Sequence, residues 1–118
     1  MSKSSYFWVY ILHCENNAYY TGYTTDLIKR YQSHQDGSGQ CKYTRSFKPL
    51  TIAQCWLVEG DKALAMKIER QIKSLSRAMK KELIMKPEIL CVHQYVHTIS
   101  HQELQRMMND PGLSPTPR

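Results

Sequence analysis

The strongest structural signal in this 118-residue sequence is the run YFWVYIL at residues 6–12. Its aromatic and β-branched residues favour an extended strand, and the run is too short for a buried helix. Because polar residues do not alternate with apolar ones, we expect this strand to be buried on both faces. Turn residues follow at 15–17 (ENN), and AYYTGY at 18–23 predicts a second strand. The two strands therefore form an antiparallel hairpin.

The segment after this hairpin, residues 24–35, predicts a helix. A threonine at its start, Thr24 or Thr25, can cap the helix, and Asp26 favours the positive end of the helix dipole; glycines follow after it. At 100° per residue, Leu27 and Tyr31 form the apolar face. Arg30 and His34 lie beside that face along one edge, where both can reach the same site.

The remainder of the chain adds one strand and two helices. Residues 40–49 (QCKYTRSFKP) form a basic loop, and residues 50–59 have the composition of a third strand. Apolar residues at helical spacing predict a helix over 62–74, and a second, basic helix follows over 76–85. This order predicts an α+β fold with a small three-stranded antiparallel sheet flanked by helices.

The chain divides near residue 88. We expect one domain at 1–88 and a C-terminal extension at 89–118 that ends in a flexible tail. Residues 91–99 have an extended pattern, and Ser100 with Glu103 resembles a capping box.

Composition indicates a folded protein with polyanionic partners. The chain is 42% hydrophobic and 22% charged, and its 16 Lys and Arg against 10 Asp and Glu give a net charge of +6. A run of about 20 apolar residues and the apolar stretch of a signal peptide are both missing, so we expect a cytoplasmic protein without a membrane partner. The cysteines lack the Cys-x-x-Cys spacing of a zinc ribbon and are expected to be reduced and mostly buried; they are Cys14, Cys41, Cys55 and Cys91.

Several short motifs occur in an informative order. Trp8-Val9-Tyr10 precedes Tyr20-Thr21-Gly22, and Arg30, His34 and Glu69 follow. This arrangement resembles the GIY-YIG nuclease superfamily, with the first two motifs in place of Gly-Ile-Tyr and Tyr-Ile-Gly.

The wider context is similar to small stand-alone bacterial members of that superfamily. The similarity includes YTGYTT at 20–25, KYTR at 42–45 followed by Pro49, and the pattern of residues 69–80. It covers roughly residues 6–86. Order and spacing together make the resemblance specific, although each short motif alone is weak.

The resemblance implies the GIY-YIG endonuclease fold and a metal-dependent endonuclease that hydrolyses DNA phosphodiester bonds in repair or processing. It implies one Mg²⁺ or Mn²⁺ ion bound by Glu69, and no small-molecule cofactor. Tyr10 would activate the attacking water with help from His34, and Tyr20 would orient water or phosphate. Arg30 would stabilise the phosphate in the transition state.

The residues themselves leave simpler interpretations open. Glu69 and Lys73 are spaced as a helical ion pair. Tyr10 and Tyr20 lie in strands rich in aromatics, where either ring could be part of the core. Two positions depart from the family pattern: Trp8 replaces the first glycine, and Tyr23 stands where some DNA-repair relatives carry a lysine.

Basic residues of the loop and the later helices are candidates for contact with DNA phosphates. They are Lys42, Arg45, Lys48, Lys73, Arg77, Lys80 and Lys81. A solvated basic surface is the alternative interpretation. His93, His97 and His101 have the spacing of one face, but packing is favoured over a metal site because their neighbours are apolar.

Two other classes of function fit the sequence. One is a nucleic-acid-binding module on the same fold with little or no turnover. The other is an adaptor that binds a protein partner through the extension at 89–118.

Overall fold

A computed structural model of the protein describes residues 5–36, 47–92 and 95–109. Its elements follow in the order strand, strand, helix, strand, two helices, 3-10 helix, strand and helix. They are β1 (Tyr6–Cys14), β2 (Tyr19–Thr24), α1 (Leu27–Asp36), β3 (Pro49–Glu59), α3 (Lys62–Lys73), α4 (Arg77–Met85), η1 (Pro87–Val92), β4 (Val96–Thr98) and α5 (His101–Asn109).

The described strands form one antiparallel sheet in the order β2-β1-β3-β4. The α+β prediction is confirmed, but the predicted number of three strands is wrong. The fourth strand, Val96–Thr98, comes from the C-terminal extension and pairs with Trp56–Val58 of β3. Three residues are too few to produce a recognisable alternation of apolar and polar side chains. The expected extended segment at 91–99 also differs at its start, because Pro87–Val92 forms a 3-10 helix.

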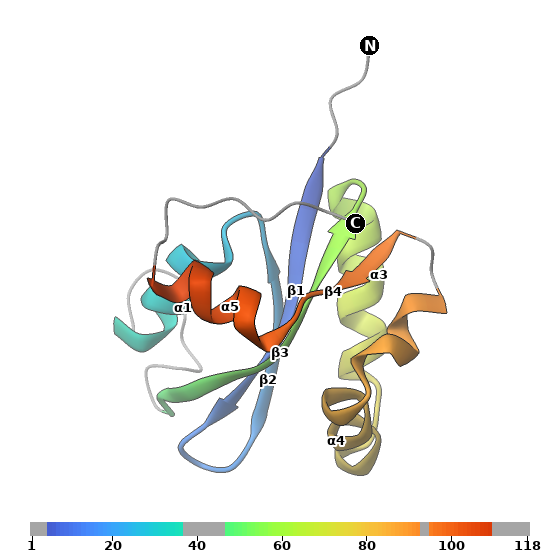
Figure 1. Ribbon diagram of the computed structural model, residues 1–118. Helices are drawn as coiled ribbons and strands as arrows, with labels where there is room; N and C mark the ends of the chain where they lie inside the picture. The colour runs from blue at the N-terminus through green and yellow to red at the C-terminus, as the bar shows by residue number, and fades with distance from the viewer. Residues whose placement is uncertain (1–4, 37–46, 93–94, 110–118) are drawn as a thin grey trace.

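Strand β1 separates two apolar layers, and its side chains are buried on both faces as predicted. Trp8, Tyr10 and Leu12 pack into the layer that includes α1 and α5, whereas Val9 and Ile11 pack against α3 and α4. Figure 1 shows the sheet nearly edge-on, with α1 and α5 on one side and α3 and α4 on the other. The protein is therefore a three-layer sandwich with β1 at its centre.

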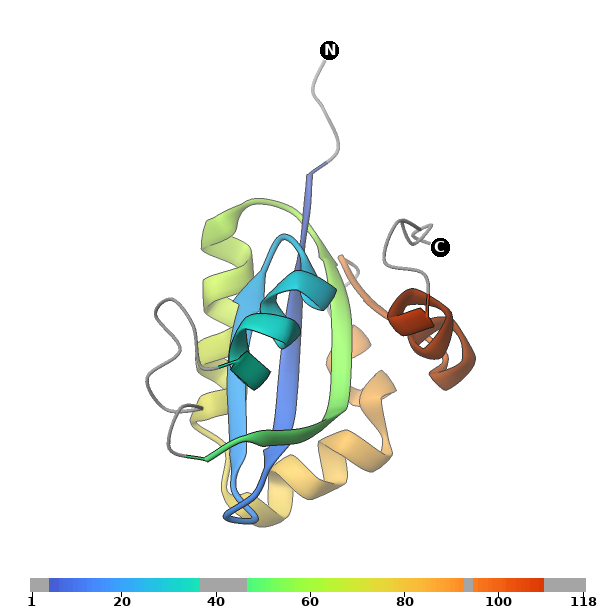
Figure 2. The ribbon, with the colours of Figure 1, turned by 90° about the vertical axis from the view of Figure 1, so that its left-hand side faces the viewer.

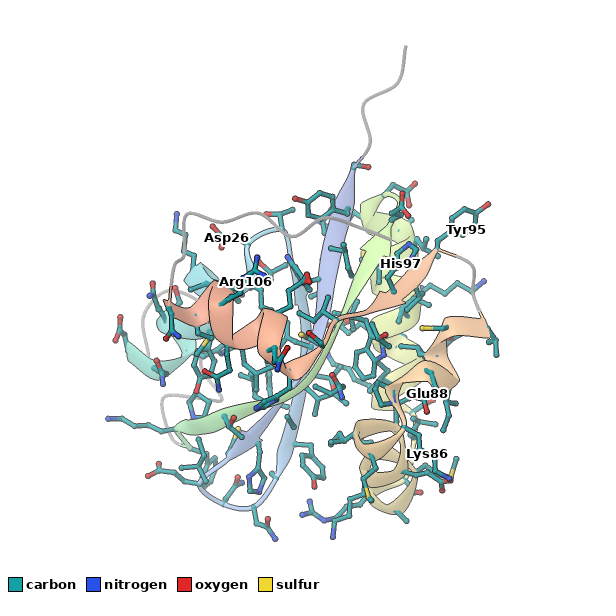
Figure 3. The ribbon with its side chains drawn as sticks, in the orientation of Figure 1. Asp26, Lys86, Glu88, Tyr95, His97 and Arg106 are labelled. Carbon is teal, nitrogen blue, oxygen red and sulfur yellow. The ribbon has the colours of Figure 1, made fainter. Side chains whose placement is uncertain are left out.

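The helices begin at capping residues, and their bounds lie within a few residues of the predicted ones. The N-cap side chains Asp61 and Ser76 accept hydrogen bonds from the backbone of α3 and α4. Ser100 Oγ accepts from Glu103 N at 3.0 Å, as the capping-box pattern predicted. At α1 the cap is Asp26, whose Oδ1 accepts from Lys29 N at 3.2 Å, in place of the expected threonine. Figure 3 labels Asp26 beside the start of α1.

Polar side chains fix the C-terminal part to the sheet. Trp56 Nε1 donates to the Pro87 carbonyl oxygen at 2.9 Å. His97 Nε2 lies 2.6 Å from Glu59 Oε1, which joins β4 to the end of β3; Figure 3 labels His97 on this strand. Val96 and Met107 are buried in the core, so the extension packs against the sheet.

Two further sequence expectations concern thiols and membrane spans. Cys14 and Cys55 are buried free thiols, Cys91 is a half-buried one, and Cys41 lies outside the described residues. Burial raises the pKa of Cys55 to about 12, so this thiol is protonated at neutral pH.

Within the described ranges, every helix is too short or too polar to cross a bilayer.

Candidate active site

An open pocket of about 440 Å³ lies at the β2 edge of the sheet. Figure 2 shows β2 at this edge, with α1 in front of the sheet and α3 behind it. The pocket is lined by side chains from β1, β2, α1 and α3. Four of the five residues predicted to be catalytic line it: Tyr10, Tyr20, Arg30 and Glu69.

The fifth predicted residue, His34, lies behind the two tyrosines. Its Nε2 is 2.9 Å from the hydroxyl oxygen of Tyr10, in a buried hydrogen bond. Its ring packs edge-on against Tyr20, with ring centroids 5.0 Å apart. The helix pattern placed His34 at a polar edge, but the side chain is only 1% exposed. His34 is therefore a buried partner of the phenol.

The environment of His34 favours its neutral form. Burial lowers the pKa of His34 to about 4, and the positive charge of Arg30 contributes in the same direction. A neutral imidazole has one protonated and one acceptor nitrogen. With the proton on Nδ1, Nε2 accepts the Tyr10 hydroxyl hydrogen.

The lowered pKa of His34 predicts a pH-dependent stability. The unfolded chain, with a histidine pKa near 6.5, binds a proton that the folded protein does not bind until the pH approaches 4. The free energy of unfolding should therefore fall between pH 6.5 and pH 4, by up to about 3 kcal/mol from this group. Denaturant unfolding across that window checks this expectation, with His34→Gln as the variant.

Glutamine does not titrate, so His34→Gln should flatten the pH dependence even if it lowers stability at every pH. All other titrating groups are shared by the two proteins and cancel in the comparison. Equal slopes for wild type and variant between pH 4 and pH 6.5 would contradict the buried neutral histidine.

Gly22 lets the Tyr10 ring pass over β2. The two residues are cross-strand partners. A Cβ added at Gly22 would lie 2.6 Å from the Tyr10 hydroxyl oxygen and 2.8 Å from Cζ, closer than van der Waals contact permits. The glycine of the second motif therefore makes room for the phenol of the first.

Arg30 and Glu69 approach the pocket from helices on opposite faces of the sheet. Arg30 Nε is buried and has no hydrogen-bond partner among the described residues. Glu69 Oε2 lies 3.6 Å from Lys73 Nζ, so the helical ion pair suggested by the sequence does form. The Glu69 side chain also lines the pocket and is 15% exposed. The ion pair thus does not remove the carboxylate from the pocket.

The donors in the pocket fit a hard cation that keeps most of its own ligands. Mg²⁺ commonly binds one or two carboxylates and completes its shell with waters and substrate phosphates. Among the described pocket residues, Glu69 is the carboxylate, with tyrosine hydroxyls nearby. The described part of the chain contains no cluster of three or more His, Cys, Asp or Glu, so a closed protein cage is not available there. The pocket is suited to a metal bound together with substrate.

The described basic residues that were predicted to contact DNA do not line the pocket. Lys73 ends α3, and Arg77, Lys80 and Lys81 continue along α4. The Arg77 guanidinium lies 4.7 Å from the ring centroid of Tyr19, which holds it against the sheet. Lys48 is exposed before β3. Lys42 and Arg45 lie outside the described residues.

The pocket also contains residues that were not among the predicted site residues, and two of them carry polar groups at the ends of long side chains. Tyr23 and Lys62 both line it. A usable signal existed for Lys62, because it precedes Glu69 by seven residues and therefore lies on the same helix face. Of the histidines of the extension, His97 bonds to Glu59 and His101 begins α5, whereas His93 lies outside the described residues.

Comparison with known protein families places the chain in a known class. The chain belongs to the family of the GIY-YIG catalytic domain, whose family model matches residues 6–82. The resemblance seen in the sequence is thereby confirmed, and with it membership of a nuclease family.

Among its relatives are small proteins named UPF0213. One from Halalkalibacterium halodurans is 42% identical over 77 residues, which is 65% of this chain and 80% of the relative. One from Halobacterium salinarum is 44% identical over 75 residues, covering 64% of this chain and 95% of the relative. A solution NMR structure of the UPF0213 protein BH0048 from Bacillus halodurans is 40% identical, covers 68% of this chain and 83% of that chain, and has a TM-score of 0.44.

Proposed function

We propose that the protein is a divalent-metal-dependent endonuclease that hydrolyses DNA phosphodiester bonds, in DNA repair or processing. The observation that carries this proposal is the convergence of Tyr10, Tyr20, Arg30 and Glu69 on one pocket, with His34 bonded to the Tyr10 hydroxyl. Family membership supports the class of reaction.

Tyr10 is proposed to take a proton from the attacking water while its own hydroxyl proton moves to His34 Nε2. A free phenol has a pKa of about 10, so this step needs a partner for the phenol proton. The positive charge of Arg30 is one reason that the pKa of His34 is low. A phosphate in the pocket would offset that charge and raise the pKa of His34, so the acceptor becomes stronger when substrate is bound.

The other pocket residues would position and stabilise the phosphate. Tyr20 would orient the water or a phosphate oxygen. The planar, permanently charged guanidinium of Arg30 suits a phosphate that gains negative charge in the transition state. Glu69 would hold the single Mg²⁺ or Mn²⁺ ion, which when bound offsets charge on the phosphate.

Contact with the rest of the DNA is proposed for the basic residues outside the pocket. Lys73, Arg77, Lys80 and Lys81 would neutralise backbone phosphates without reading sequence. The same role is proposed for Lys48 and for Lys42 and Arg45.

A second candidate is a DNA-binding module with little turnover, and the ion pair between Glu69 and Lys73 favours it. In that case Glu69 would stabilise α3 and would not hold a metal ion. DNA binding would then be sensitive to salt, and no metal-dependent nicking would accompany it.

The protein partner predicted for the extension remains a prediction. Deletion of residues 89–118 would not test it cleanly, because the deletion also removes β4 and the buried Met107 from the core. Substitutions at Val92 and Tyr95, which are 83% and 52% exposed, would leave the core intact.

Nicking of supercoiled plasmid tests the proposed function. Wild type should nick with Mg²⁺ or Mn²⁺ and stop when EDTA is added. Arg30→Ala should lower the rate by about 10² to 10³, the effect of losing one preorganised charge at a transition state. Arg106→Ala is the matched control and should nick like wild type, because Arg106 is an exposed arginine of α5 that does not line the pocket.

Three results would contradict the nuclease: no nicking by wild type, nicking that persists in EDTA, or equal nicking by Arg30→Ala and wild type. Salt-sensitive DNA binding by a wild type that does not nick would identify the binding module.

A further inference from the structure

The pocket contains a second cation, Lys62, in addition to Arg30. Lys62 is the first residue of α3 and precedes Glu69 by seven residues. Seven residues turn a helix through nearly two full turns and advance it by about 10 Å. Lys62 and Glu69 therefore lie on the same face of α3, at two levels along the pocket.

The two cations flank the pocket from opposite layers. Arg30 comes from α1 on one face of the sheet, and Lys62 comes from α3 on the other. Lys62 is exposed and forms no salt bridge with any described residue, whereas Lys73 of the same helix pairs with Glu69. The Lys62 ammonium is thus available to an anion that enters between the two helices.

Helix stability does not account for a lysine at this position. The first turn of α3 contains no acidic residue, and Asp61 caps it. The amino end of a helix carries partial positive charge, so a cation there is disfavoured. An alternative use for the charge is binding a negatively charged ligand in the pocket that Lys62 lines.

We infer that Lys62 binds a backbone phosphate of the substrate strand next to the phosphate that is cleaved. The inference rests on the proposed nuclease function. The separation of about 10 Å along α3 places Lys62 away from the level of Glu69, where the reaction would occur. A phosphate bound there keeps the same charge throughout the reaction, so Lys62 contributes to substrate binding equally before and during the chemical step.

Lys62→Ala is the test, with Lys67→Ala as the control. Lys67 is an exposed lysine of the same helix that does not line the pocket. Lys62→Ala should weaken binding of a DNA duplex, measured without metal by fluorescence anisotropy, by about tenfold. The slope of log affinity against log salt should decrease by about one. In cleavage, KM should rise by the same factor while kcat stays unchanged.

Two further measurements separate phosphate binding from a structural role. Lys62→Arg should keep most of the affinity, because it keeps the charge. The thermal midpoint of Lys62→Ala should equal or exceed that of wild type, since a cation at the start of the helix is disfavoured. A lower midpoint with unchanged affinity would assign Lys62 to the fold.

The inference and the proposed function fail in different ways. If wild type nicks DNA but Lys62→Ala binds and cleaves as well as Lys67→Ala, the role of Lys62 is overturned and the nuclease stands. A drop in kcat with unchanged KM would also overturn it, since it would place Lys62 at the reacting phosphate. If wild type neither binds nor cleaves DNA, both are overturned.

Discussion

Glu69→Gln is expected to lower metal-dependent DNA cleavage by about a thousandfold. Glutamine keeps the size of the side chain and an oxygen donor but removes the negative charge that a divalent cation requires. A bound cation supplies several kcal/mol of stabilisation to the transferring phosphate, and each 1.36 kcal/mol is about a factor of ten in rate. Single-turnover cleavage with Mg²⁺ and with Mn²⁺ measures the effect.

The same substitution distinguishes the two interpretations of Glu69. If the carboxylate serves only its ion pair with Lys73, the loss is limited to stability, by about 0.5 kcal/mol, and cleavage is unchanged. Glu88→Gln is the control, because Glu88 is an exposed acid on η1 that does not line the pocket. Full cleavage by Glu69→Gln would refute the metal role, whatever its stability.

Tyr10→Phe is expected to lower cleavage by about 10² to 10⁴, the usual contribution of a general acid or base. The ring remains to fill the core, but the hydroxyl that bonds His34 Nε2 at 2.9 Å is lost. Because the histidine nitrogen stays buried without this partner, stability should also fall by about 1–3 kcal/mol. Cleavage rates are compared at a temperature where both proteins are folded, as judged by circular dichroism.

Tyr6→Phe is the matched control for Tyr10→Phe. Tyr6 begins the same strand, is half-buried, and does not line the pocket. It should cleave DNA like wild type and unfold at nearly the same denaturant concentration. If both variants cleave equally, Tyr10 is a core residue, as the aromatic composition of its strand also allowed.

The fold was predictable where a residue pattern is long enough to show its period. The apolar run of β1 and the helical spacing of Ile68 and Ile72 on α3 each span several residues of one face, and both elements occur as expected. Strand β4 is three residues long and depends on pairing with β3, so its own sequence contains too little information. Strand β4 forms because it pairs with β3, and the sequence of a single segment does not encode such a contact.

The site was predictable in part for a similar reason. Family motifs identified Tyr10 and Tyr20, and the pocket brings them together with Arg30 and Glu69. The motifs do not include Lys62, and only its spacing of seven residues from Glu69 places it on the pocket side of α3. They also could not indicate the burial of His34, which depends on both tyrosine rings covering it. The catalytic roles themselves remain predictions until the variants are measured.

The position of β1 between two apolar layers has a consequence for local dynamics. Its backbone is paired on both sides, with β2 and with β3, and its side chains are covered on both faces. Amide hydrogens of such a strand exchange with deuterium only when the whole domain opens, whereas the short β4 and the terminal α5 can detach at lower free energy. The phenol of Tyr10 is thus carried by the strand that is expected to exchange most slowly, whereas β4 and α5 are expected to open first.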